Sequence, residues 1–577
     1  MFYVWYGLVV AMRYYKDPFL YWLQGHYHQP GDKILTNKSI FQYLLIFFFV
    51  IMSPHLTFST PLPVIPDENP NLYGMSTPAG SGRNNTGVPT ICKVVMLTDT
   101  SPTSSGIGGV GVDTDDSDGI VSGDLRYCLT MTKSPKIVIF EVSGTIFLNA
   151  DIKIGKNLGA EAETKGSYIT IAGQTAPSPG ITIARRTFVL ERNTHDILIQ
   201  HLRFRAGDDL SGADGKVADF QDCFQDYWSY NGIDTFPTAN IVIDHCSFSW
   251  GVDENLEIGG RDHTIQNCII SEGLDRGVHP KGRHSKGMQT INYGSNDSNA
   301  GAQRLAIIKN LFAHNVDRNP YISGGAALIS NNVCFDTGVG VLANEANYKI
   351  VKMSVAGNYI YNTDLLSAAM YFVIGSYVGS KIYLGTDNYF YGEIKTNPWP
   401  PMGLEDTEER KTLSDPNSDI PELFKTSSAS EAIWPTGYEQ MSAEEARDYV
   451  LKHAGARPAD RDPVDNRVIN DVKEGLTAID LIDTVYYSNE DCTAEGEPME
   501  CCTGKGTGDC VRNAEAGWPL LAENIRPLDI PENPHQIQES GYTKIEEWLH
   551  DFARGVENMP NECVPPKKPQ NLQIVNK

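Results

Sequence analysis

Ile243-Asp244-His245-Cys246 and Ile265-Gln266-Asn267-Cys268 are two copies of one pattern, 22 residues apart. Ile308-Lys309-Asn310-Leu311 and Ile329-Ser330-Asn331-Asn332 follow, so that the successive steps are 22, 43 and 21 residues. We interpret the steps as one, two and one repeats, because a fixed period of this length is typical of a solenoid. Alternating aliphatic residues precede each copy and a polar corner follows, which predicts a short strand and then a turn.

Short strand-like segments of the same kind continue on both sides of these copies. Examples are Lys136-Ile137-Val138-Ile139-Phe140, Tyr168-Ile169-Thr170-Ile171 and Ile197-Leu198-Ile199-Gln200. No helical pattern interrupts them, which argues against an α/β fold. Stacked coils of this kind predict an all-β parallel β-helix, whose core forms between neighbouring rungs. We assign residues 80–400 to this domain.

Asp253 and Glu257 lie between the first two copies of the pattern. If this segment were fully extended, the two carboxylates would lie ~13 Å apart at ~3.3 Å per residue, too far to share an ion. A bend at Gly251 would place Asp253 on a corner and point Glu257 outward, with Leu256 and Ile258 inward. Two converging carboxylates on a rigid rung suit Ca²⁺, which takes about six to eight oxygen ligands. A solvated acidic turn is the alternative.

Several motifs, in the same order, resemble those of the pectate lyase family, polysaccharide lyase family one. Asp253-x-x-Leu256-Glu257-Ile258 resembles the family's calcium segment D-x-x-L/V-D-I, and Arg318-x-Pro320-x-x-Ser323-Gly324-Gly325 resembles its catalytic segment R-x-P-x-x-R-G-G. Asp244-His245-Cys246-Ser247-Phe248-Ser249-Trp250 resembles its D-H-x-S-x-S-W run. Ser271-Glu272-Gly273-Leu274 with His279 and Lys281-Gly282 resembles a segment of a bacterial subgroup that carries a C-terminal extension. The resemblance spans roughly residues 76–400.

The resemblance implies a right-handed parallel β-helix and a calcium-dependent polysaccharide lyase. Such an enzyme cleaves polygalacturonate (pectate) by β-elimination and leaves 4,5-unsaturated oligogalacturonides. Asp253 and Glu257 would bind Ca²⁺, Lys286 would bind substrate with Lys281 as a near rival, and Arg318 would abstract the C5 proton. A guanidinium is a weak base because its pKa lies above ~12, so neighbouring cations would have to favour its neutral form. The alternative is that Arg318 only stabilises charge and water is the base.

Three positions depart from the family's pattern. The family has another calcium aspartate about 13 residues before the D-H pair, where this chain has Asn231. We therefore expect an insertion, and either Asp219 or Asp226 as the further ligand. Ser323 replaces the second arginine of the catalytic segment and Tyr321 an arginine often found beside it, which leaves the substrate preference open.

The charge of the chain restricts its partners. The 47 basic and 72 acidic residues give a formal net charge of −25, which argues against nucleic acid. An acidic plant-type polysaccharide, homogalacturonan, is the expected partner if Ca²⁺ bridges its carboxylates to the protein. We expect a monomer without a stable membrane partner. A pectin lyase acting on methylated substrate and a non-catalytic glycan-binding β-helix remain alternatives, whereas the paired carboxylates of a polygalacturonase-type hydrolase form no motif here.

The residues before the β-helix fall into three predicted segments. Lys38-Ser39 precedes the 13-residue apolar run Ile40–Met52, which is too short for a comfortable membrane span and suits a signal peptide. We assign residues 33–60 to that peptide and residues 1–32 to a non-native leader, with a signal anchor as the second interpretation. Residues 61–79, which are rich in proline, are predicted to be a linker. A secreted protein is expected, with the periplasm or outer surface also open.

Residues 401–577 are predicted to form a partly helical extension laid on the β-helix. Its predicted helices begin at Ser442, Asp462 and Thr543 and end near Gly455, Gly475 and Gly555. Five cysteines crowd this region, and an exported protein would form disulfides there: Cys492, Cys501, Cys502, Cys510 and Cys563. Cys246 and Cys268, one rung apart, could be bridged or could be buried free thiols, and no spacing matches a common zinc pattern.

Overall fold

A computed structural model describes residues 62–100, 106–155, 166–207, 231–274, 284–291, 303–337, 342–343, 351–361, 381–385, 387–390, 393–394, 425–476 and 521–557. These residues belong to one unit, residues 61–577. Asp219, Asp226 and Lys281 lie outside the described residues, as do the predicted leader, the signal peptide and the five C-terminal cysteines. Among the described helices, none is both long and apolar enough to cross a membrane.

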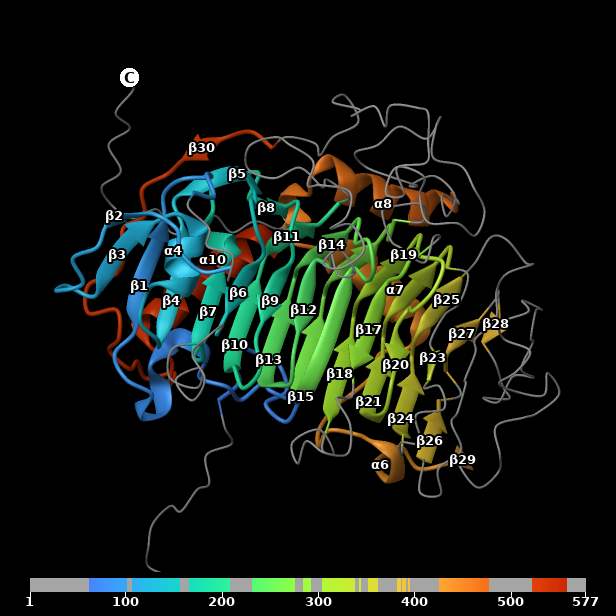
Figure 1. Ribbon diagram of the computed structural model, residues 1–577. Helices are drawn as coiled ribbons and strands as arrows, with labels where there is room; N and C mark the ends of the chain where they lie inside the picture. Colours follow the sequence, from blue (N-terminus) through green and yellow to red (C-terminus); the bar gives the residue numbers. More distant parts are fainter. Residues whose placement is uncertain are drawn as a thin grey trace, which may run out of the picture. The chain divides into compact units, whose positions relative to one another are not determined.

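Three parallel sheets run along the molecule, and each coil contributes one strand to each sheet in turn (Figure 1). The first, which we call the site sheet, contains β6 (Ile152–Ile154), β9 (Phe188–Leu190), β12 (Ile233–Thr235), the beginning of β15 (Leu256–Gln266), β17 (Met288–Ile291), β20 (Tyr321–Ile322) and β23 (Leu342–Ala343). The predicted parallel β-helix is confirmed, and strand twist favours a right-handed winding for such parallel crossovers.

The second sheet, the long sheet, contains β3 (Ile120–Gly123), β1 (Thr90–Val94), β4 (Lys136–Phe140), β7 (Ile169–Ala172), β10 (His195–Gln200), β13 (Thr238–Asp244), the end of β15, β18 (Arg304–Ile308), β21 (Gly325–Ser330), β24 (Val351–Ala356), β26 (Lys381–Leu384) and β29 (Lys425–Thr426). A short strand, β2 (Gly111–Asp113), pairs antiparallel with β3.

The third sheet, the helix-covered sheet, contains β5 (Val142–Phe147), β8 (Ile181–Ala184), β11 (Leu202–Arg205), β14 (Ser247–Ser249), β16 (Ile269–Ser271), β19 (Leu311–Ala313), β22 (Val333–Phe335), β25 (Tyr359–Tyr361) and β27 (Tyr389–Phe390). Antiparallel strands β30 (Asn524–Ile525) and β28 (Glu393–Ile394) pair with β5 and β27.

Identical or similar residues stack along the core at matching positions of successive rungs. One such column is Ile171, Ile199, Ile243, Ile265, Ile307, Ile329 and Val355, and every member is buried. The step from Ile265 to Ile307 is a single rung with a long excursion, not the two repeats that the sequence predicts. The predicted partner Ile308 is one residue off, because Ile307 and Ile308 are consecutive aliphatics and the sequence does not show which one points inward.

A ladder of asparagines closes the turn between the long and the helix-covered sheets. Asn310, Asn332, Asn358 and Asn388 are stacked, and each of the first three donates its backbone N–H to the side-chain oxygen of the next. Cys246 and Cys268 occupy the same column and are both buried free thiols, so the free-thiol alternative is correct. Cys92 and Cys128 instead form a disulfide that the sequence analysis did not predict.

The segment before β1 packs against the β-helix. Val64, Leu72 and Met75 are at most 4% exposed and cover the outer face of the long sheet beside Leu198 and Val242. The prediction of a linker at residues 61–79 is therefore wrong for residues 62–79, because the apolar residues between the prolines are buried in a hydrophobic core. Two short 3₁₀ turns, η1 (Ala79–Ser81) and η2 (Arg83–Asn85), complete the segment, and α4 (Leu125–Thr130) follows β3.

The C-terminal helices pack on the helix-covered sheet and on the long sheet. The helices are α6 (Ala429–Ala432), α7 (Ala443–His453), α8 (Pro463–Glu474) and α10 (Lys544–Glu557), with the 3₁₀ turn η6 (Pro458–Asp460). A further 3₁₀ turn, η4 (Gly173–Thr175), follows β7. Val450 of α7 and Val468 of α8 pack on Ile269 and Leu311 of the helix-covered sheet. Leu549 of α10 packs with residues of β1 and β4. The predicted helix starts are correct, but α10 continues past Gly555 to Glu557.

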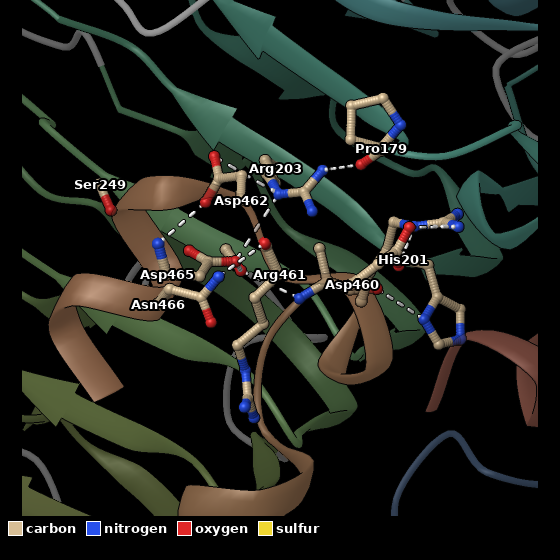
Figure 2. A network of polar contacts seen from close by, with 12 residues as sticks. Pro179, His201, Arg203, Ser249, Asp460, Arg461, Asp462, Asp465 and Asn466 are labelled. Atoms are coloured by element: carbon tan, nitrogen blue, oxygen red, sulfur yellow. Dashed lines mark hydrogen bonds and ion pairs between the residues drawn. The ribbon is translucent and has the colours of Figure 1, made fainter. Parts of the chain in front are cut away.

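Buried charges fasten α8 to the β-helix, and Figure 2 shows Arg203 facing Asp462 and Asp465 at the start of this helix. Arg205 Nη2 lies 2.9 Å from Asp462 Oδ2 and 3.0 Å from Asp465 Oδ1, and all three side chains are about 1% exposed. Arg203 Nε lies 3.6 Å from Asp462 Oδ2, and Arg203 Nη1 donates to the carbonyl oxygen of Pro179. Asp462 also caps α8 by accepting the backbone N–H of Asp465. The same carboxylates thus start a helix and attach it to the sheet.

Candidate active site

A row of polar side chains crosses the outer face of the site sheet. Strand register aligns Asp234 of β12 with Glu257 of β15, Gln289 of β17 and Tyr321 of β20. Leu256 and Ile258 on either side of Glu257 are buried in the core, as the expected alternation requires. Neighbouring parallel strands are ~4.8 Å apart, so these four residues form a continuous strip.

Asp234 and Glu257 are two carboxylates that face each other on adjacent strands. Burial and the nearby charge of Asp234 raise the pKa of Glu257 to about 10, and burial raises the pKa of Asp234 to about 6. Asp253 adds further negative charge to both of them. Asp234 Oδ1 is buried and has no hydrogen-bond partner within the part of the chain that the structure describes. A crowded group of acidic oxygens with an unsatisfied buried member is a donor set that suits a hard cation.

Asp253 lies on the corner before β15, as predicted. Its Oδ1 is 2.6 Å from His284 Nε2, so an imidazole contacts one of its oxygens. The structure thus places Asp253 near enough to Glu257 and Asp234 for its charge to act on both, while its own potential ligand atom lies within 4.8 Å of those of Glu254 and His284. The sequence analysis passed over Asp234, because the expected spacing from the D-H pair led to Asn231.

Asn231 has a different function in the structure. It is buried, and its side-chain oxygen accepts the backbone N–H of Glu254 at 2.9 Å. This bond connects the coil that carries Asp234 to the corner that carries Asp253. Asn231 therefore shapes the acidic corner through the backbone of Glu254.

Lys286 and Arg318 lie on the next two rungs from this corner. Lys286 pairs with Asp317 in an isolated parallel bridge, and its Nζ is 2.7 Å from Asp317 Oδ2. Arg318 is the residue after Asp317, and its backbone is left-handed with φ +62°. Arg318 lies two rungs beyond the calcium segment, because Glu257, Gln289 and Tyr321 are aligned on three successive strands.

Arg318 contacts the fully buried carboxylate of Glu254 through Nη1 and also lies over the ring of Tyr321, with its guanidinium carbon 5.6 Å from the ring centroid. The carboxylate stabilises the charged guanidinium, so this contact opposes loss of a proton. Glu254 and Asp317 were not predicted as site residues. Glu254 pairs with Arg318 and Asp317 pairs with Lys286, each across different rungs. A single sequence contains no local pattern that indicates such pairs.

The assembled site can bind and polarise an acidic ligand. Carboxylates outnumber lysine and arginine around the strip, so an anionic ligand would be repelled unless a cation intervened. Lys286 and Arg318 lie just before β17 and β20, the strands that carry Gln289 and Tyr321 of this strip. Such an arrangement fits a cation held between the protein carboxylates and the carboxylates of a ligand.

No protein-family model matches this chain. A curated relative named "Probable pectate lyase C" from Aspergillus terreus is 27% identical over 440 residues, which cover 75% of this chain and 86% of that protein. The protein of the same name from Emericella nidulans is 26% identical over 435 residues, 75% of this chain and 85% of that protein. Among solved structures, a thermostable pectate lyase is 14% identical with a TM-score of 0.40, covering 67% of this chain and 97% of that one.

Proposed function

Because this chain belongs to the pectate lyase family, we propose that it is a calcium-dependent lyase that cleaves polygalacturonate by β-elimination. The observation that carries the proposal is the group of Asp234, Asp253 and Glu257 beside Lys286 and Arg318. The calcium segment and the catalytic segment that resemble those of the family contain Asp253, Glu257 and Arg318. The curated relatives named above come from Aspergillus terreus and Emericella nidulans, and membership of the bacterial subgroup stays a prediction.

Three carboxylates would hold the calcium ion: Asp234, Asp253 and Glu257. Their oxygens are the ligand type that Ca²⁺ prefers, and the raised pKa values of Asp234 and Glu257 reflect negative charge and burial that a cation would offset. Bound calcium would supply charge stabilisation for the uronate carboxylate next to the reacting carbon. Asp234 replaces Asp219 and Asp226 as our leading candidate for the third ligand.

The chain's own residues would bind and orient the substrate. Lys286, held by Asp317, would donate a charge-assisted hydrogen bond to a uronate carboxylate. Arg318 would stand beside C5 with its position set by Glu254. Following the family resemblance, Arg318 would take the C5 proton, and the electron pair of the C5–H bond would form the C4–C5 double bond. O4 would leave with the electron pair of the C4–O4 bond and take a proton from water.

The contact with Glu254 is the observation that favours a second role for Arg318. A guanidinium beside a buried carboxylate is held charged, and a charged guanidinium cannot accept a proton. In that case Arg318 would stabilise the developing negative charge and water would accept the proton. The two roles predict different pH dependences of kcat, and Glu254→Gln separates them.

The function is tested by ultraviolet absorbance of the unsaturated product. Polygalacturonate, methylated pectin and a matched neutral glucan are each incubated with the full chain, with Ca²⁺ and after exhaustive chelation. We expect product from polygalacturonate with Ca²⁺ only. Full activity after chelation would overturn the calcium assignment and favour a pectin lyase. Binding without product would favour a non-catalytic glycan-binding protein.

We also propose that the protein is secreted and acts on extracellular homogalacturonan as a monomer. The apolar run Ile40–Met52 and the Cys92–Cys128 disulfide support export, because disulfides persist in oxidising compartments. Detection of the mature chain in culture medium, with its first residue mapped by mass spectrometry, tests both the localisation and the predicted signal peptide.

A further inference from the structure

Two histidines stack at the corner where the long sheet meets the helix-covered sheet. His201 follows β10 and His245 follows β13, and the register of Gln200 with Asp244 places them on successive rungs. Both have left-handed backbones, with φ of +57° and +48°. Their rings are 5.1 Å apart and within 14° of parallel. The next residues of this corner column are Asn267 and Lys309, so the pair of imidazoles is confined to these two rungs.

The hydrogen bonds of His201 leave one ring nitrogen available. Nδ1 lies 2.8 Å from the carbonyl oxygen of Ala456, which can only accept, so Nδ1 carries the proton. Figure 2 shows His201 against this C-terminal segment. Nε2 is buried, has no well-aligned hydrogen bond among the described residues and lies 3.4 Å from Glu557 Oε1. In the neutral ring, two lone pairs therefore face each other, and a proton or a metal ion between them would relieve this contact.

Glu557 and Asp244 complete the group around this nitrogen. Glu557 is the last residue of α10, and its Oε1 is also 3.9 Å from His245 Nδ1. His245 Nδ1 is 3.0 Å from Asp244 Oδ1. One potential ligand atom from each of the four residues lies within 4.8 Å of the others. Asp244 is held in place by amide donors from Gln200, Gln266 and Asn267.

We propose that His201, His245, Glu557 and Asp244 form a binding site for a transition-metal ion of the zinc type. A tetrahedral ion with bonds of about 2.0–2.1 Å holds its ligand atoms about 3.3 Å apart, and the separations of 3.0, 3.4 and 3.9 Å bracket that spacing. Two imidazoles favour zinc over calcium, which prefers oxygen alone. The carbonyl of Ala456 orients His201 as outer partners orient metal-bound histidines.

The geometry gives this ion a structural function. Four protein ligands close a tetrahedral shell and leave no position for a substrate. Three ligands come from the β-helix and Glu557 comes from the end of α10, so the ion would fasten that helix to the coils. Binding would displace the proton that His245 Nδ1 shares with Asp244. The site stands apart from the carboxylates of the site sheet and does not depend on the proposed lyase activity.

A second buried histidine provides a matched control. His314 Nδ1 lies 2.8 Å from Asp336 Oδ2, and His314 Nε2 lies 3.5 Å from Asp471 Oδ2 of α8. This group has the same chemistry and also joins a coil to a C-terminal helix, but it holds a single imidazole. We therefore expect no zinc site at His314.

The test uses the full chain, stripped of metal and kept in excess Ca²⁺ so that oxygen-rich sites are filled. Zn²⁺ is titrated against a chromophoric chelator, and Co²⁺ is added separately as a visible-absorption probe of tetrahedral coordination. We expect one tight Zn²⁺ per chain and an intense Co²⁺ band. His201→Gln, His245→Gln and Glu557→Gln should each weaken Zn²⁺ binding at least about 100-fold, whereas His314→Gln should leave it unchanged.

The result that overturns the site is an unmodified chain that binds no Zn²⁺ in the micromolar range, or variants that bind it as tightly as the parent. In either case the cluster is a protonated His245 held between two carboxylates without metal. Circular dichroism checks the fold of each variant. If the histidine variants do not fold, Glu557→Gln decides alone, because Glu557 lies at a helix end with 27% of its side chain exposed. Zn²⁺ should raise the melting temperature of the parent but not of this variant.

Discussion

At the scale of single residues, Asp234 is the first side chain to test. Asp234→Asn keeps the shape but removes one charge from the proposed calcium group, so the Ca²⁺ concentration for half-maximal activity should rise at least about tenfold, equivalent to ~1.4 kcal/mol. Calcium titrations of activity and calorimetry measure this. Asp118→Asn, on an exposed loop, is the control and should change neither value. An unchanged calcium requirement in Asp234→Asn would remove this residue from the ligand set.

Glu254 decides what Arg318 does. Glu254→Gln removes the negative charge that holds the guanidinium charged, so the neutral form becomes more accessible. If Arg318 accepts the proton, the alkaline rise in kcat should move to lower pH, and this is the outcome we expect. A lower kcat with an unchanged pH profile would instead show that the Arg318 guanidinium stays charged and does not accept the proton.

Arg318→Lys should lower kcat by at least ~10³, because it removes the planar guanidinium with its five N–H donors.

His263 should make the protein sensitive to acid. Its Nδ1 accepts the backbone N–H of Ile241 at 3.1 Å, so the buried ring has to be neutral, and burial lowers its pKa to about 3. The unfolded chain takes up this proton near pH 6.5. The stability is therefore complete above pH ~6.5 and falls by ~1.4 kcal/mol per pH unit as the pH decreases toward 3.

Urea unfolding of the parent and of His263→Gln across this pH range measures the effect. Glutamine can accept from Ile241 and donate to Gly259, whose carbonyl oxygen lies 3.2 Å from His263 Nε2. The variant should lose this part of the pH slope and remain folded. Equal slopes in the two proteins would show that His263 does not remain neutral.

At the scale of elements, the attachment of α8 rests on buried charge. Asp465→Asn leaves Arg203 and Arg205 with only one full carboxylate partner, and breaking a buried pair typically costs ~3–5 kcal/mol. We expect a loss of about 3 kcal/mol in urea unfolding. Asp448→Asn on α7, an exposed pair with Arg447, should change little. Equal effects of the two variants would mean that α8 is held by its apolar contacts alone.

The elements also show how far the sequence could lead. Ile243 and Ile265 were aligned correctly because one aliphatic residue stands before each polar corner, whereas the consecutive Ile307 and Ile308 hid the register of the next rung. Asp234 was passed over because the expected spacing led to Asn231, and β12, with only three residues, shows no alternation that would have pointed to Asp234 instead. The partners of Arg205 are more than 250 residues downstream, and no local pattern predicts such a pair.

At the scale of the whole molecule, the net charge of −25 opposes binding of a polyanion. Raising NaCl from about 20 to about 200 mM shortens the Debye length from roughly 20 Å to below 10 Å and screens this repulsion. At saturating Ca²⁺, KM for polygalacturonate should therefore fall several-fold while kcat changes little. Initial rates at several salt concentrations measure this, and a KM that rises with salt would mean that local basic contacts outweigh the net charge.

The single rung between Ile265 and Ile307 spans 42 residues, whereas the rungs before and after it span 22. The pitch of the coil is unaffected, because the same aliphatic column continues through both ends of the excursion. For protein engineering, this coil is a natural acceptor for foreign loops. Segments of different length could be exchanged between β17 and β18, where neither Lys286 nor Arg318 lies, while the aliphatic column keeps its register.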